Sequence, residues 1–213
     1  MAAPNDIIVY HYPYSPYARR IIWYLTLRGI QYAQCLQPPV MPRPDIAALG
    51  ISYRRIPVVS IGRDVYADTR LILEKLEQRF PNGALGAKDS EHKALEKLLS
   101  RWIIDGDVFK RAAGLIPVDM PIMKDPKFIK DREGFSGRPW SKEALEKAIP
   151  ENLIVIRDAF HMLETTLLAD RRDWVLRTET PSLADIEGML SKTRHDCVLR
   201  WLSTNESSSH MGV

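Results

Sequence analysis

The first 80 residues carry a succession of strand and helix patterns that few folds accommodate. An apolar, β-branched run over residues 6–12 leads directly into a helix pattern that ends near Gly29. A second alternating strand pattern follows over residues 30–37. Two strands joined by a helix favour a parallel pair with a right-handed crossover.

A hairpin pattern then reverses the direction of the sheet. After a short helix pattern, the apolar runs Val58–Ile61 and Val65–Ala67 flank a turn that contains Gly62, which predicts an antiparallel pair. A further helix begins at Asp68 or Thr69, since both residue types cap helix N-termini well. The order β-α-β-α-β-β-α predicts an α/β domain with a mixed sheet.

The second part of the chain is predicted to be helical. Strand patterns fade after residue 84, and a Pro-rich stretch over residues 115–140 has room for one short helix. Pro150 is expected to separate two of the helices, because it removes a backbone donor. The longer helices are predicted over residues 90–114, 141–148 and 151–170.

This change of pattern predicts two domains, an α/β domain over residues 1–82 and an all-helical domain over residues 83–213. In the second domain, Ser182 and Asp185 form a capping box at the start of a further helix. Only 23 residues follow Leu190, and the polar end from about residue 203 is predicted to be disordered.

Charge and composition exclude several classes of function. A net charge of +3, from 30 basic and 27 acidic residues, does not favour nucleic-acid binding. No apolar run approaches the roughly 18 residues that cross a membrane, and the first residues do not resemble a secretory signal. Cys35 and Cys197 share neither metal nor redox spacing. We therefore expect a cytoplasmic protein without a metal site.

The turn after the first strand contains a distinctive frame. Ser15-Pro16-Tyr17-Ala18 has the spacing of Cys-Pro-Tyr-Cys, the redox turn that opens a helix in thioredoxin-like folds. Neither cysteine is present. Because disulfide exchange proceeds through a protein thiolate, a glutaredoxin-like oxidoreductase is disfavoured.

Together with two later motifs, this frame resembles the glutathione transferases. In serine- and cysteine-type members, Ser or Cys follows the first strand and Arg comes five residues later, as do Ser15 and Arg20. A cis-proline precedes the third strand, where this chain has Ile56-Pro57. The amino-acid sequence from Pro42 to Glu77 looks most like that of a group of fungal glutathione transferase-like proteins. The resemblance implies a thioredoxin-like N-terminal domain followed by an all-helical domain.

The third motif of the resemblance is an acidic–hydroxyl pair at the start of the third helix, here Asp68-Thr69. In this family it holds the γ-glutamyl end of glutathione. Thr69 would bind the carboxylate through its hydroxyl and backbone N–H, and Asp68 would meet the ammonium group. Asp68 as an ordinary N-cap is the alternative.

The resemblance also implies how the thiol and the remaining parts of glutathione are held. Ser15 would donate to the sulfur and stabilise the thiolate, and the backbone of Ile56, before Pro57, would pair with the cysteinyl part. Arg43 would meet the glycyl carboxylate, with a solvated loop charge as an equal alternative.

Other assignments of these side chains stay open. Ser15 could be a plain N-cap, with the thiol donor supplied by a tyrosine instead. Arg20, with its neighbour Arg19, is expected at a solvated helix edge or in structural ion pairs. The rival tyrosines are Tyr10, Tyr12 and Tyr14.

These features predict a glutathione transferase-like protein that conjugates glutathione, its co-substrate, to a small hydrophobic electrophile. A homodimer and a role in detoxification or secondary metabolism follow from the resemblance. The helical part of the family continues further beyond the capping box, so this chain is expected to be shortened. That expectation favours the alternative of a non-catalytic binding protein with the same fold. A glutathione-dependent isomerase or reductase is a further alternative.

Overall fold

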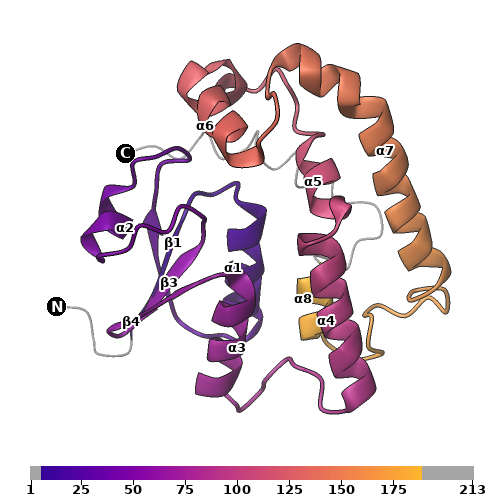
Figure 1. Ribbon diagram of the computed structural model, residues 1–213. Coiled ribbons are helices and arrows are strands. Elements are labelled where there is room, and N and C mark those ends of the chain that lie inside the picture. The colour runs from indigo at the N-terminus through magenta and orange to yellow at the C-terminus, as the bar shows by residue number, and fades with distance from the viewer. Residues whose placement is uncertain (1–5, 189–213) are drawn as a thin grey trace. The chain divides into compact units, whose positions relative to one another are not determined.

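The computed structural model describes residues 6–188 (Figure 1). The chain divides into two compact units between Gly86 and Ala87. The first unit holds all the strands of the described part of the chain, and the second is helical. Each unit is described below by itself.

The first unit is built on a four-stranded sheet with the order β2-β1-β3-β4. β1 pairs with β2 in parallel, whereas the β1–β3 and β3–β4 pairs are antiparallel. The predicted mixed sheet, with its parallel pair and its hairpin, is therefore confirmed. The strands are β1 (Ile7–His11), β2 (Ala33–Leu36), β3 (Val58–Ile61) and β4 (Asp64–Ala67).

The register of the sheet brings distant segments to one edge. Tyr10 lies opposite Cys35 of β2 and Val58 of β3, and Val58 lies opposite Ala67 of β4. The chain therefore leaves β1, β2 and β4, and enters β3, at the same edge of the sheet. The three motifs that follow or precede these strands consequently share that edge.

Three helices cover this sheet, with α1 and α3 on one side and α2 on the other (Figure 1). α1 packs against α3. Apolar side chains of these two helices, among them Ile21, Leu25, Ile72 and Leu76, are fully buried. The helices are α1 (Pro16–Leu27), α2 (Pro44–Ala48) and α3 (Thr69–Arg79).

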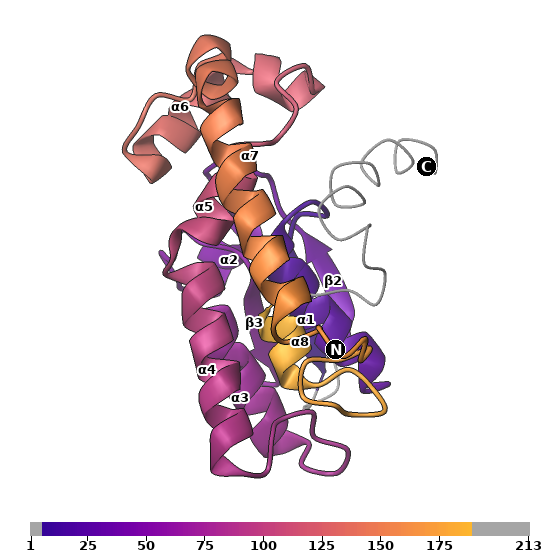
Figure 2. The same cartoon turned by 90° about the vertical axis from the view of Figure 1, so that its right-hand side faces the viewer.

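The second unit differs from the sequence prediction at two breaks. The pattern over residues 90–114 forms two helices, which separate at Asp105 and Gly106. Conversely, Pro150 lies inside one continuous helix, α7, so the predicted break there is wrong (Figure 2). The helices are α4 (Ser90–Ile104), α5 (Asp107–Ala113), the 3-10 helix η1 (Pro121–Lys124), α6 (Pro126–Ser136), α7 (Lys142–Thr165) and α8 (Leu183–Glu187).

The apolar face of α7 explains why the helix continues through Pro150. Leu145, before the proline, and Ile156 and Leu163, after it, are all buried. α7 also packs against α5. Proline removes one backbone donor from the helix, but a helix held by packing on both sides of it tolerates a local bend.

The capping box at the start of α8 is confirmed. The Asp185 carboxylate accepts from Ser182 N at 2.8 Å, Ser182 Oγ at 2.6 Å and Val175 N at 2.9 Å. Val175 also belongs to an apolar cluster that includes Leu99 of α4 and Ala184 of α8. The predicted disordered end and the shortening of the helical part fall on residues outside those described.

Candidate functional site

Ser15 lies where the chain turns from β1 into α1. Its side chain is 1% exposed, its Oγ accepts from Ala18 N at 3.3 Å, and its backbone N donates to Tyr12 O at 3.0 Å. Ser15 is therefore the N-cap of α1, as one of the two interpretations predicted. A hydroxyl that accepts a hydrogen bond keeps its own proton to donate, so capping does not exclude a second role toward a ligand.

Ile56 and Pro57 lie at the same sheet edge, immediately before β3. Their peptide bond is cis, as the resemblance implies. The Ile56 side chain packs in an apolar cluster with Tyr10, Ala18 and Val58. Because the Ile56 side chain is buried in this cluster, its backbone is the part available to a ligand.

Asp68 and Thr69 follow β4 and begin α3. Asp68 is the N-cap, and its Oδ1 accepts from Arg70 N at 2.9 Å while the side chain is 41% exposed. Asp68 also has φ 72° and ψ 122°, a conformation that a residue with a side chain seldom adopts. Strained backbone positions of this kind concentrate at functional sites. The backbone of Asp68 therefore favours a role in a binding site in addition to capping α3.

Arg20 connects the two helix starts. Its side chain is fully buried, and Nη1 donates to Thr69 Oγ1 at 2.8 Å. Burial lowers the pKa of the Arg20 guanidinium from its ordinary value to about 10. The expectation of a solvated helix edge is therefore wrong for Arg20. The spacing of five residues from Ser15 was its only sequence signal.

Arg43 is buried in the loop that follows β2. It is 4% exposed, with Nε donating to Pro38 O at 2.9 Å and Nη2 to Pro39 O at 3.1 Å. Nη1 donates to Arg54 O, and the guanidinium lies 5.9 Å from the centre of the Tyr12 ring. The alternative of a solvated loop charge is therefore wrong. A contact between Arg43 and the glycyl carboxylate stays a prediction.

The remaining predicted side chains lie around the turn and on β2. Tyr10 is buried in the sheet, and the rings of Tyr12 and Tyr14 lie 4.8 Å apart. Cys35 is on β2 as expected but is only partly buried, and burial raises the pKa of its thiol. Gln37 donates to Cys35 Sγ at 3.3 Å.

The arrangement suits a ligand that carries negative charge at two points. The starts of α1 and α3 lie at one sheet edge, each with a hydroxyl residue in its first turn, and a helix N-terminus stabilises an anion. Within residues 6–188, no cluster of three His, Cys, Asp or Glu side chains could hold a metal ion. No helix in the same range is long and apolar enough to cross a membrane.

Two family models match the chain. Residues 9–84 match "Glutathione S-transferase, N-terminal domain". Residues 111–207 match "Domain of unknown function (DUF7962)". The first match covers the strands and helices that carry Ser15, Ile56-Pro57 and Asp68-Thr69.

Relatives of known name match over part of their length. Glutathione S-transferase U1 of Arabidopsis thaliana is 25% identical over 91 residues, which are 43% of this chain and 41% of the relative. The chain therefore spans about two fifths of that relative.

Solved structures share the fold over most of the chain. A GST-like protein from Pseudomonas syringae has a TM-score of 0.64 at 24% identity, over 93% of this chain and 58% of that one. A Tau class glutathione S-transferase from mango, Mangifera indica, has a TM-score of 0.66 at 14% identity, over 97% and 80%. A glutathione transferase family member from Pseudomonas fluorescens, with bound glutathione, has a TM-score of 0.62 at 20% identity. The match covers 96% of this chain and 86% of that one.

Proposed function

We propose that this chain, which belongs to the glutathione transferase superfamily, binds glutathione at the sheet edge of its first unit and activates the thiol for transfer to a small hydrophobic electrophile. The observation that carries the proposal is the pairing of two helix starts. Ser15 begins α1, Thr69 begins α3, and Arg20 of α1 donates to Thr69 Oγ1.

The thiol is held at the start of α1. Ser15 Oγ accepts from Ala18 N, and this bond leaves the hydroxyl proton free to be donated to the sulfur. A hydrogen-bond donor and a helix N-terminus both favour a thiolate over a thiol. The resulting thiolate attacks the electrophile, and Ser15 forms no covalent bond with it.

The γ-glutamyl end is held at the start of α3. Arg20 donates to the Thr69 hydroxyl, which leaves the hydroxyl proton for the carboxylate of the ligand. The half-exposed carboxylate of Asp68 meets the ammonium group in addition to capping α3. The backbone of Ile56, before the cis bond to Pro57, pairs with the cysteinyl part, and Arg43 reaches the glycyl carboxylate.

A non-catalytic binding protein with the same fold is the second candidate. Residues 111–207 match a domain of unknown function, so nothing in that match requires catalysis. A glutathione-dependent isomerase or reductase would use the same thiolate. We also propose a cytoplasmic location and a homodimer, the latter tested by light scattering of the purified protein.

Binding and turnover distinguish these candidates. Glutathione affinity is measured by titration calorimetry, and turnover with a panel of electrophiles, for the wild type and for Ser15→Gly. Glycine caps a helix almost as well as serine, so this variant removes the hydroxyl and keeps the cap. We expect binding to persist, the pKa of the bound thiol to rise and turnover to fall.

The variants Tyr14→Phe and Ser15→Thr are the matched controls, because the first removes a rival hydroxyl and the second keeps the proposed one. A wild type that binds no glutathione contradicts the proposal. Normal turnover in Ser15→Gly would show that a tyrosine or the backbone, and not Ser15, donates the hydrogen bond to the thiol. Binding without turnover for any electrophile favours the non-catalytic candidate.

A further inference from the structure

A row of polar side chains runs along the interface between α1 and α3. Arg20, Tyr24 and Arg28 are spaced four residues apart, which places them on one face of α1. Opposite them on α3 are Thr69 and Glu77. We call these five residues the α1–α3 seam. The start of α1 is bonded to the start of α3, and the end of α1 to the end of α3, so the two helices run parallel.

The bonds of the seam are short and mostly buried. At its first end, Arg20 Nη1 donates to Thr69 Oγ1 at 2.8 Å. At its far end, Tyr24 Oη donates to Glu77 Oε1 at 2.6 Å, and Arg28 Nη1 lies 3.2 Å from the same oxygen. The Arg28 side chain is 4% exposed and that of Glu77 17%. Water therefore has little access to the charges at this end.

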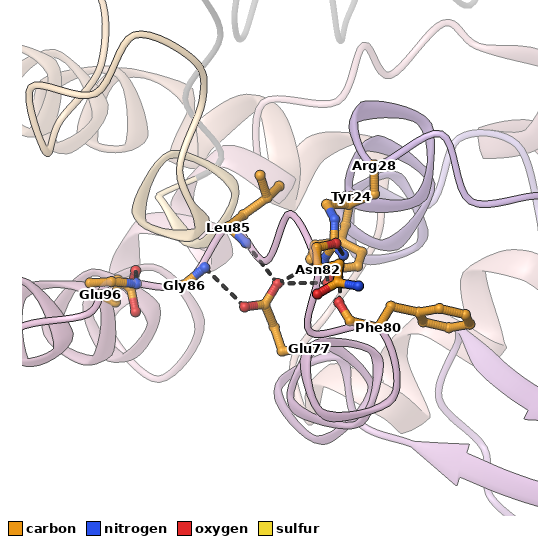
Figure 3. A network of polar contacts seen from close by, with 9 residues as sticks. Tyr24, Arg28, Glu77, Phe80, Asn82, Leu85, Gly86 and Glu96 are labelled. Carbon is orange, nitrogen blue, oxygen red and sulfur yellow. Dashed lines mark hydrogen bonds and ion pairs between the residues drawn. The ribbon is translucent and has the colours of Figure 1, made fainter.

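Glu77 also holds the segment that leaves the first unit (Figure 3). Its Oε1 accepts from Leu85 N at 2.9 Å, and its Oε2 accepts from Gly86 N at 2.9 Å. One carboxylate therefore joins the end of α1, the end of α3 and residues 85–86.

Arg28 closes the end of α3 in the same network. Its Nη2 donates to Phe80 O at 2.5 Å and to Asn82 O at 2.8 Å. These carbonyls lie at and just beyond the C-terminus of the helix, where backbone acceptors have no partner within the helix. The guanidinium therefore joins the end of α1 to the end of α3 as part of the same network as Glu77.

We propose that Glu77, with Tyr24 and Arg28, acts as a positioning group that fixes Ser15 and Thr69 relative to each other from the far end of the seam. This inference rests on the proposed binding of glutathione at that edge. The thiol and the γ-glutamyl carboxylate belong to one ligand, so Ser15 and Thr69 must keep one separation to hold both.

The physical basis is the difference between apolar packing and hydrogen bonding. The buried side chains of α1 and α3, such as Leu25 and Leu76, resist separation of the helices because the hydrophobic effect is non-directional. They oppose a small sliding of one helix along the other much less. Hydrogen bonds weaken steeply with distance and angle, so the bonds at both ends set the register. α1 is about 18 Å long, and a helix transmits movement of its end to its N-cap.

The experiment compares Glu77→Gln with Glu74→Gln, the same change one turn earlier on the exposed side of α3. Glutathione affinity is measured by calorimetry, and the exchange of the Ala18 amide, which donates to Ser15 Oγ, by hydrogen-exchange NMR. We expect Glu77→Gln to weaken glutathione binding about three- to thirtyfold and to speed Ala18 exchange. Glu74→Gln should change neither.

Two further variants separate positioning from general damage. Tyr24→Phe removes one hydroxyl from the seam, keeps the ring, and serves if Glu77→Gln does not fold. The double variant Arg20→Lys with Glu77→Gln should weaken glutathione binding by less than the product of the two single effects. Both substitutions act on the same property, the position of α1 along α3. Turnover at saturating glutathione should fall less than affinity does.

The results separate this inference from the proposed function. If the wild type binds glutathione and both Glu77→Gln and Tyr24→Phe bind it equally well, the positioning role is wrong and the proposed function stands. If the wild type does not bind glutathione, the proposed function fails, and the Ala18 amide still tests the seam. Unchanged Ala18 exchange in both variants would overturn the positioning role in that case too.

Discussion

Replacing Arg20 with methionine tests how much free energy the protein expends to keep a cation between α1 and α3. The side chain is fully buried, and burial lowers its pKa from the ordinary value of an arginine to about 10. At about 1.4 kcal/mol per pKa unit, the buried charge costs about 3 kcal/mol of folding stability. The folded protein would release this proton before the unfolded chain does. The cost is therefore fully present at neutral pH and is relieved only as the pH rises beyond about 10.

One opposing term is the hydrogen bond to Thr69. Without Arg20, the buried Thr69 hydroxyl loses a donor, which costs about 1–3 kcal/mol. Methionine has a similar length and fills the space without a charge. Replacing a whole buried ion pair with apolar residues is often neutral or stabilising, and the Thr69 partner of Arg20 is uncharged. We therefore expect the free energy of unfolding of Arg20→Met to be unchanged or to rise by up to about 2 kcal/mol. Glutathione affinity should fall, because the Thr69 hydroxyl is no longer held.

Urea denaturation near neutral pH gives the stability, and titration calorimetry gives the affinity. Arg19→Met is the matched control, since it removes a partly exposed charge from the same turn of α1 and leaves the bond to Thr69. A loss of more than about 2 kcal/mol in Arg20→Met alone would show that the favourable contacts of Arg20 together outweigh its burial cost. Undiminished glutathione binding would refute the role given to Thr69.

Three further outcomes follow from other parts of the chain. Asp185→Asn should lower the free energy of unfolding by about 2–4 kcal/mol, because a buried carboxylate with three donors loses part of its acceptor capacity; a thermal unfolding curve equal to that of the wild type would contradict this. The Cys35 thiol, its pKa raised by burial and then by Asp45, should react slowly with Ellman's reagent, and Asp45→Asn should react faster in a Cys197→Ser background. Burial raises the pKa of Tyr24 above its ordinary value of 10, so its stabilising contribution is present below pH 10 and is lost as the pH rises beyond it. The urea midpoint should consequently fall more steeply with pH in the wild type than in Tyr24→Phe.

Local chemistry made the first unit largely predictable. Strand alternation, the Gly62 turn and the N-caps at Ser15 and Asp68 each depend on a few neighbouring residues, and their positions in the structure agree with the prediction. The cis bond before Pro57 was accessible only through the family resemblance, because a sequence does not specify the isomer.

The failures concern residues whose state depends on distant partners. Arg20 is bonded to a residue 49 positions further along the chain. The Arg43 guanidinium donates to the carbonyls of Pro38 and Pro39 in its loop and to that of Arg54, 11 positions further on. Neither contact leaves a periodic signal, so a charged side chain is expected at the surface by default. Pro150 was misjudged for a related reason, since the packing that holds α7 continuous lies on another helix.

The buried polar groups of α1 are better explained by position than by stability. A purely apolar interface with α3 would avoid the cost of burying Arg20 and Arg28, and such interfaces are commonly as stable or more so. We infer that the polar groups of this interface are retained because they select one arrangement among several of similar packing energy. In this unit they lie along the two helices whose N-termini face the proposed ligand. We therefore expect apolar substitution in the seam to keep the fold and to weaken glutathione binding. If affinity and stability instead fell together, the seam would be an ordinary part of the core.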